Sequence, residues 1–170
     1  MELKDTTAIV TGGARGIGRG IAVELAKAGA NIVVADLPVV ADDAAETLKL
    51  VEAEGRTAIF VQTNVRTFAD CEAMAQAAVD KFGSFEILVN NAGVVHVGAV
   101  ATLSEEDWDR VIGVNLTGMF LASKACIPQL VQRDAWRDQY ARRDANIDAG
   151  LGRAKEDRGD GRDGLPPKRR

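Results

Sequence analysis

The stretch Ala8-Ile9-Val10-Thr11-Gly12-Gly13-Ala14-Arg15-Gly16-Ile17-Gly18 decides the fold of this chain. Its apolar start is typical of a buried strand, and its glycines predict a tight turn that leads into a helix. Gly12 and Gly13 permit a turn that side chains would block. Gly16 lets the backbone approach a ligand, and Gly18 lets the following helix pack closely on the strand. The fold therefore starts with a strand, a glycine-rich loop and a helix.

The helix after this loop presents its N-terminus to the space beyond the strand. The first N–H groups of a helix have no intrahelical partner and attract anions. The next apolar run, Ile32-Val33-Val34-Ala35, ends at Asp36, at the distance expected for a carboxylate that binds a ribose. Together these features favour a dinucleotide site whose pyrophosphate lies at the helix N-terminus. An ordinary glycine-rich turn between a strand and a helix remains the alternative.

Length and composition limit the classes of protein that fit. A chain of 170 residues is about one domain with a substantial core. Glu2, Lys4 and Asp5 precede the first apolar run, so we expect no signal peptide, and no run approaches transmembrane length. We therefore expect a cytoplasmic protein with no membrane partner and no metal. Cys71 and Cys126 are expected to be buried free thiols.

Apolar spacing predicts strands that alternate with helices. The strands are expected at 8–11, 32–36, 57–61 and 87–89, and the helices at 17–28, from 39 to about 54, from 67 to about 82, and from 104 onward. Wholly apolar strands joined by helices predict an α/β fold with a parallel sheet that is covered on both faces. Ligands of such sheets bind at the carboxyl ends of the strands.

Two helix starts carry capping signatures. Thr67 is followed by Asp70 and Ser104 by Asp107, which are acidic versions of the capping box. Both serine and threonine side chains at such positions are expected to accept a hydrogen bond from the helix backbone.

The helix that starts at Ser104 has an apolar stripe interrupted by Asn115. An amide in such a stripe costs about 1–3 kcal/mol unless it is hydrogen-bonded. Asn115 therefore has either a structural role, bonding backbone groups at a helix distortion, or a catalytic one. Trp108 and Phe120 in the same helix are expected to pack in the core or against another helix.

Together these features resemble the short-chain dehydrogenase/reductase family. The resemblance covers about residues 5–130 and implies a Rossmann-type, doubly wound parallel sheet that binds a nicotinamide dinucleotide. It implies an oxidoreductase that transfers a hydride between the cofactor and a secondary alcohol or its ketone. The motifs that carry it are Thr11 to Gly18, Asp36, Asn64-Val65, Asn90-Asn91-Ala92-Gly93, and Asn115 within Val114-Asn115-Leu116-Thr117-Gly118.

The resemblance also implies a role for each matching residue. Asp36 would bind the hydroxyls of the adenosine ribose, and Asn115 would be a catalytic residue that positions a relay water. The other residues would contact three parts of the dinucleotide: the pyrophosphate by Gly12, Arg15, Gly16, Ile17 and Gly18, the adenine by Asn64 and Val65, and the nicotinamide side by Asn91, Ala92 and Gly93.

Asp36 predicts NAD rather than NADP. A carboxylate accepts hydrogen bonds from the 2′ and 3′ hydroxyls of the ribose, whereas it would repel a 2′-phosphate. Arg15 keeps the alternative open, because NADP-dependent members of the family also carry a basic residue in this loop.

The resemblance ends before the catalytic residues. Family members continue with a strand that ends in a catalytic Ser and a helix that bears Tyr-x-x-x-Lys, in which the Tyr is the general acid/base and the Lys lowers its pKa. Here the only tyrosine, Tyr140, is followed four residues later by Asp144, and Lys155 has no Tyr four residues before it. The leading interpretation is an oxidoreductase of this family, and the sequence does not decide whether this chain is catalytically active. The alternatives are a catalytically inactive NAD-binding module and a non-functional remnant.

The residues that follow the family-like part differ in composition. Residues 133–170 are half charged and have the composition of a disordered tail, so we expect an NAD-binding domain at 1–132 and a charged tail at 133–170. We hypothesise that a changed reading frame or a deletion replaced the catalytic half. The sheet would then be truncated after the fourth strand and helix, with strand order 3-2-1-4 and an open edge.

Two expectations about partners follow. Family members form dimers or tetramers through their fourth and fifth helices, so a homo-oligomer is doubtful for a chain without the fifth. The basic end Lys168-Arg169-Arg170 is expected to be a solvated terminus rather than a nucleic-acid site. The expected partner is therefore a small-molecule alcohol or carbonyl compound.

Overall fold

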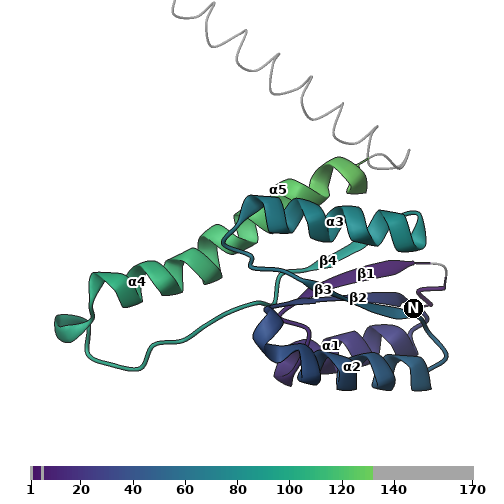
Figure 1. The fold of residues 1–170 in the computed structure, drawn as a ribbon, viewed down its shortest axis with the longest axis horizontal. Helices are drawn as coiled ribbons and strands as arrows, with labels where there is room; N and C mark the ends of the chain where they lie inside the picture. Colours follow the sequence, from purple (N-terminus) through teal and green to yellow (C-terminus); the bar gives the residue numbers. More distant parts are fainter. Residues whose placement is uncertain (1, 5, 132–170) are drawn as a thin grey trace, which may run out of the picture. The chain divides into compact units, whose positions relative to one another are not determined.

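The computed structural model describes residues 2–4 and 6–131 and contains one parallel sheet in the order β3-β2-β1-β4 (Figure 1). The expected α/β class and strand order 3-2-1-4 are confirmed. The charged segment 133–170, with Tyr140, lies outside the described residues, so the division at residue 132 stays a prediction. The strands are β1 (Thr7–Thr11), β2 (Asn31–Asp36), β3 (Ala58–Gln62) and β4 (Ile87–Val89).

The helices follow the strands as the apolar spacing predicted. They are α1 (Gly16–Lys27), α2 (Ala41–Ala53), α3 (Phe68–Phe82), α4 (Glu105–Ile112) and α5 (Met119–Leu130). Short helical turns stand between them: η1 (Pro38–Val40), η2 (Val100–Thr102) and η3 (Gly113–Gly118), of which η3 is π-helical and joins α4 to α5.

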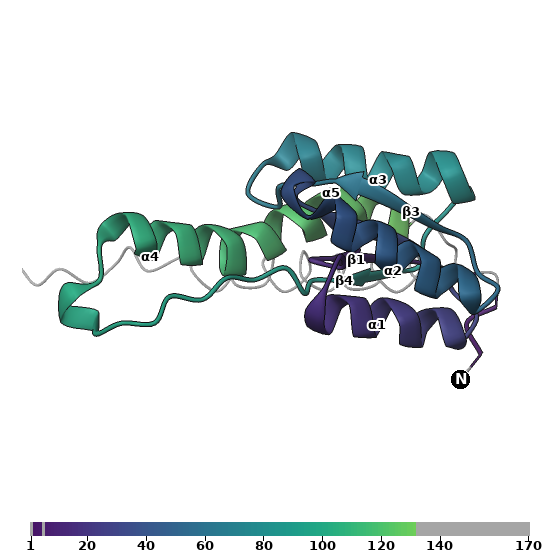
Figure 2. The ribbon, with the colours of Figure 1, turned by 60° about the horizontal axis from the view of Figure 1, so that its bottom comes forward.

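Helices cover both faces of the sheet. Alternate strand residues face opposite layers: Ala8 and Val10 pack with α1 and α2, whereas Ile9 packs with α3 and α5. Figures 1 and 2 show α1 and α2 on one face and α3 and α5 on the other. All of β1 is buried, which explains why its sequence is continuously apolar.

The register brings three strand ends together. β1 lies between β2 and β4, and Thr11 at its end pairs with Ala35, while Val10 pairs with Val89. The segments that follow these strands therefore meet at one edge of the sheet. The strand order reverses at β1, which is the point where open α/β sheets bind their ligands.

The two predicted capping boxes have different outcomes. The Ser104 hydroxyl accepts a hydrogen bond from the Asp107 N–H at 3.1 Å, as expected. The Thr67 side chain makes no capping hydrogen bond, so that prediction is wrong. The Asp70 carboxylate instead accepts the N–H of Asn64 at 2.9 Å, which links the start of α3 to the loop after β3.

Trp108 and Phe120 do not lie in the core. Their exposed fractions are 56% and 61%. Trp108 is on α4, which has no buried residue, and α5, which carries Phe120, instead buries the side with Ala122 and Cys126 against α3. Within the helical stretch Glu105–Leu130, a window of 18 residues has a mean hydropathy of 1.4, and the stretch is long enough to span a membrane, contrary to expectation. One such helix is weak evidence for a membrane segment, since core helices pass the same test.

Candidate dinucleotide site

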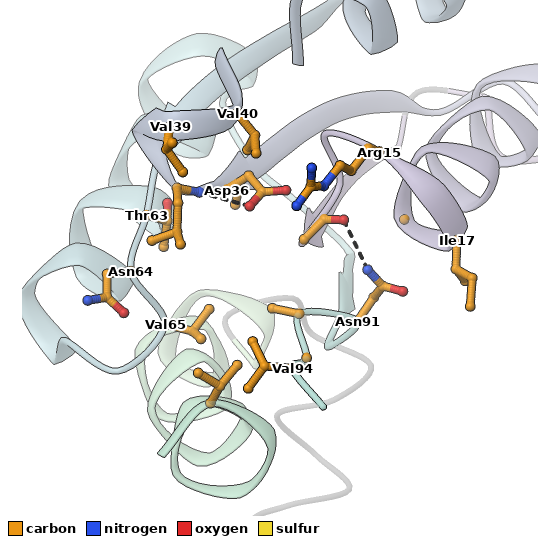
Figure 3. A pocket seen from close by; sticks show the side chains of 17 residues that line it. Arg15, Ile17, Asp36, Val39, Val40, Thr63, Asn64, Val65, Asn91 and Val94 are labelled. Atoms are coloured by element: carbon orange, nitrogen blue, oxygen red, sulfur yellow. Dashed lines mark hydrogen bonds between the residues drawn. The ribbon is translucent and has the colours of Figure 1, made fainter. Parts of the chain in front are cut away.

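A cavity of about 380 Å³ opens at the carboxyl ends of the strands (Figure 3). Its volume falls in the range of small-molecule sites. The structure brings together all the predicted cofactor-binding residues except Gly16, which does not line the cavity. Those that line it are Gly12, Arg15, Ile17, Gly18, Asp36, Asn64, Val65, Asn91, Ala92 and Gly93.

The glycine-rich loop has a conformation that requires glycine. Gly16 has φ +57, in the left-handed region that side chains disfavour. A Cβ at Gly18 would collide with the carbonyl oxygen of Gly12 and would lie 2.6 Å from the Asn91 amide nitrogen. The loop and the start of α1 therefore lie so close together that no side chain fits at Gly18.

The start of α1 is suited to an anion. Arg15 stands at the N-cap position without a side-chain capping hydrogen bond, and the first turn contains no acidic residue. The free N–H groups and the positive end of the helix dipole thus lie at the loop, and no acidic side chain of the first turn neutralises them. A pyrophosphate fits this arrangement.

The Asp36 carboxylate is held at the end of β2. Its Oδ2 accepts the N–H of Ala14 at 3.0 Å, and its Oδ1 accepts the N–H of Leu37 at 2.8 Å. Because an ionised carboxylate has about four acceptor positions, two remain for hydroxyl donors of a ligand. Figure 3 labels Arg15 and Asp36, which both line the cavity. The Arg15 guanidinium lies 3.8 Å from the Asp43 carboxylate.

Asn91 supports the loop from the end of β4. Its side-chain amide donates to the carbonyl oxygens of Thr11 at 2.9 Å and Gly12 at 3.1 Å. The same residue lines the cavity, so it fixes the wall of the site through the backbone of β1.

Asn115 lies in the π-helical turn η3 and does not line the cavity. Its Oδ1 accepts the N–H of Val94 at 2.8 Å, and its Nδ2 donates to the Val94 carbonyl at 2.9 Å. This is the structural role that the sequence left open, a side chain that bonds backbone groups at a helix distortion. It anchors Val94, which does line the cavity.

Sequence reasoning missed much of the apolar wall. The apolar run that follows Asp36 was a usable signal, since it continues past the strand end into η1. The missed residues are Ala35, Leu37, Val39, Val40, Thr63, Val94 and Val114. Among the residues that the structure describes, no three His, Cys, Asp or Glu side chains gather as metal ligands.

Comparison with known proteins gives a consistent result. A family model described as short chain dehydrogenase matches residues 6–136. The L-2,3-butanediol dehydrogenase of Corynebacterium glutamicum is 43% identical over 118 residues, which are 69% of this chain and 46% of that protein. This chain spans about half the length of the curated relatives it matches.

Solved structures agree with this result. Carveol dehydrogenase from Mycobacterium avium in complex with NAD has a TM-score of 0.72 and 31% identity, covering 77% of this chain and 51% of its own. A short chain dehydrogenase from Mycobacterium paratuberculosis bound to NAD has a TM-score of 0.73 and 32% identity, covering 78% of this chain and 53% of its own. The sheet order, the glycine-rich loop and these matches show that the chain belongs to the short-chain dehydrogenase family.

Proposed function

We propose that this chain binds NAD(H) in the cavity at the ends of β1, β2 and β4, and that it prefers NAD over NADP. The observation that carries the proposal is the Asp36 carboxylate, which is held by two backbone N–H groups beside the glycine-rich loop. The N-terminus of α1 would bind the pyrophosphate, and Asp36 would accept the ribose hydroxyls. The NAD complexes of two similar structures support this assignment.

By family, the chemistry is oxidoreduction of a secondary alcohol or its ketone. NAD(H) supplies the hydride chemistry when bound. This chain's residues would bind the dinucleotide and fix its orientation. Asn115 would be a positioning residue, which holds the Val94 segment of the cavity wall. The name of the butanediol dehydrogenase relative supports a small hydroxylated substrate. A cytoplasmic location agrees with two free buried thiols.

Titration of the full chain with NADH and NADPH, followed by nucleotide fluorescence, tests the binding proposal. We expect tighter binding of NADH. Asp36→Asn should lower the affinity for NADH about tenfold, since hydrogen bonds to a charged group are stronger than those to a neutral one. The difference between the affinities for NADH and NADPH should become smaller. Asp109→Asn is the matched control, because it removes one negative charge from an exposed position of α4. Tighter binding of NADPH than NADH would overturn the preference.

A second function is NAD(H) binding without turnover. It is favoured by the lack of a Tyr-x-x-x-Lys pair in this sequence, whose only tyrosine, Tyr140, comes too early in the chain and is followed four residues later by Asp144. In the family the Lys lowers the pKa of the catalytic Tyr, because an ordinary tyrosine, with a pKa near 10, is a poor base at neutral pH. NADH formation from NAD with a panel of secondary alcohols separates the two functions. Turnover supports the oxidoreductase, whereas NADH binding with no turnover supports the binding module.

A further inference from the structure

The Ala14 residue of the glycine-rich loop is held from both sides. Its N–H donates to Asp36 Oδ2 at 3.0 Å. Its carbonyl oxygen accepts hydrogen bonds from the Thr47 hydroxyl at 2.7 Å and from Arg19 Nε at 3.2 Å and Nη2 at 3.1 Å. The N–H and C=O of one residue belong to adjacent rigid peptide planes. Holding both therefore fixes the backbone conformation of Ala14 and the direction in which its N–H points.

Arg19 and Thr47, which we name the Ala14 clamp, come from α1 and α2. Thr47 is fully buried, and its hydroxyl also accepts from Arg19 Nε at 3.0 Å. The guanidinium donates further to the Asp43 carbonyl at 3.0 Å and lies 3.0 Å from the Glu46 carboxylate. A planar guanidinium with this many fixed partners has little freedom to move. The clamp thus connects the position of α2 to the conformation of the loop.

We propose that Arg19 and Thr47 are positioning residues that hold the Asp36 carboxylate for the ribose through the Ala14 N–H. This inference rests on the proposed NAD(H) site and deepens it. Asp36 receives one of its two backbone donors from Ala14 and the other from Leu37 beside it in the chain. Loss of the clamp frees Ala14 to turn and leaves Asp36 with the local donor alone. The affinity for NADH and its advantage over NADPH then both fall.

The other explanation is that Arg19 and Thr47 only stabilise the packing of α1 on α2. The two explanations differ in where a substitution acts. If the two residues only pack the helices, their replacement lowers the stability of the whole domain evenly. If they position Ala14, their replacement weakens the Ala14–Asp36 hydrogen bond more than it weakens the other contacts of the domain. Arg19→Met and Thr47→Val remove the donors while keeping much of the side-chain volume. Lys49→Met is the matched control, because it removes a positive charge from an exposed position of α2.

The first readout is amide hydrogen exchange in the full chain without nucleotide. The exchange rate of the Ala14 N–H is divided by that of the core strand residue Val33. A global loss of stability raises the Val33 rate at least as much as the Ala14 rate, so only a local release of Ala14 raises the ratio. We expect this ratio to rise about tenfold in Arg19→Met and in Thr47→Val, in line with the loss of a charged hydrogen-bond donor, and to stay unchanged in Lys49→Met. An unchanged ratio in both clamp variants overturns the inference.

The second readout is a double-mutant cycle with Asp36→Asn. We expect Arg19→Met to raise the Kd of NADH about tenfold on the native background and to have little effect when Asp36 is already replaced. An equal loss on both backgrounds overturns action through Asp36. If the native chain binds neither NADH nor NADPH, the proposed function fails, and the exchange ratio still decides whether the clamp holds Ala14 against Asp36.

Discussion

Thr11 and Asn91 join the ends of β1 and β4 across 80 residues of sequence. The Thr11 hydroxyl accepts the N–H of Asn91 at 3.0 Å and of Ala92 at 3.1 Å, and it donates to the Val89 carbonyl at 3.1 Å. The Asn91 side chain returns a hydrogen bond to the Thr11 carbonyl at 2.9 Å. This reciprocal contact continues the strand pairing into the loops that form the cavity.

Replacement of Thr11 by Val tests the contribution of this contact. Thr11 is 1% exposed, so Thr11→Val removes the hydroxyl acceptor of the half-buried Ala92 N–H. It also leaves the Asn91 N–H with the Val89 carbonyl at 3.0 Å as its remaining acceptor. We expect a loss of about 1–3 kcal/mol in the free energy of unfolding, measured by urea denaturation. Thr57→Val at an exposed position is the control and should change stability by less than about 0.5 kcal/mol. Equal stability of the two variants would contradict the role of the hydroxyl.

The part of the site that is local in sequence was predictable. The glycine-rich loop and Asp36 follow directly from apolar runs that end at punctuating residues. The strand order 3-2-1-4, which decides which strand ends meet, came from the family resemblance instead. The fold class followed from the same alternation, because a wholly apolar strand must be covered on both faces. These features depend on spacing along the chain, which a sequence displays.

The part that depends on packing was not predictable. Arg19 and Thr47 are 28 residues apart and look like ordinary helix residues until α1 and α2 lie side by side. Asp70 matched a capping motif, but its carboxylate accepts the N–H of a loop residue instead of completing that motif. Trp108 was expected to be buried because it is apolar, but it is exposed. An apolar side chain alone does not show whether another element covers it. In each case the competing partner comes from a different element of the structure.

The contact between Asn115 and Val94 predicts a stabilising role that is independent of any catalytic one. Asn115→Ala removes two hydrogen bonds to the Val94 backbone, and we expect a loss of about 1 kcal/mol together with faster exchange of the Val94 N–H. Thr117→Ala, at an exposed position of the same turn, is the matched control. If Asn115→Ala is as stable as the control and Val94 exchanges equally slowly, the anchor has no energetic role.

The buried thiols predict a loss of stability in alkaline solution. Burial raises the pKa of Cys71 to about 11 and that of Cys126 to about 12, from an ordinary value of 9.0. Above pH 9 the unfolded chain loses these protons while the folded chain retains them, so stability is complete below pH 9 and falls as the pH rises toward 11 and 12.

Urea unfolding at pH 7.5 and pH 10.5 measures this effect. The native chain should lose more stability between these pH values than the double variant Cys71→Ala, Cys126→Ala, which retains every other titrating group. Thiol-specific reagents should modify neither cysteine of the folded chain at neutral pH, because the reactive thiolate is absent. A native chain and a double variant with the same pH dependence would show that the thiols do not titrate as their burial implies.

Two glycines of α1 predict opposite effects of the same substitution. A Cβ at Gly18 would collide with the Gly12 carbonyl and crowd the Asn91 amide, whereas a Cβ at Gly20 meets nothing within 4 Å. Gly18→Ala should therefore cost about 1–3 kcal/mol in the free energy of unfolding through overpacking. Gly20→Ala should add about 0.5–1 kcal/mol, since alanine loses less backbone entropy in a helix.

Both variants add one methyl group to the same helix, α1, so each is the control for the other. Gly18→Ala should also abolish NADH binding, because the loop and the start of α1 can no longer approach each other, while Gly20→Ala should bind NADH as the native chain does. Urea denaturation and NADH titration of the two variants measure stability and binding separately. If Gly18→Ala keeps both native stability and native NADH affinity, the close approach of α1 to the loop is not what shapes the site.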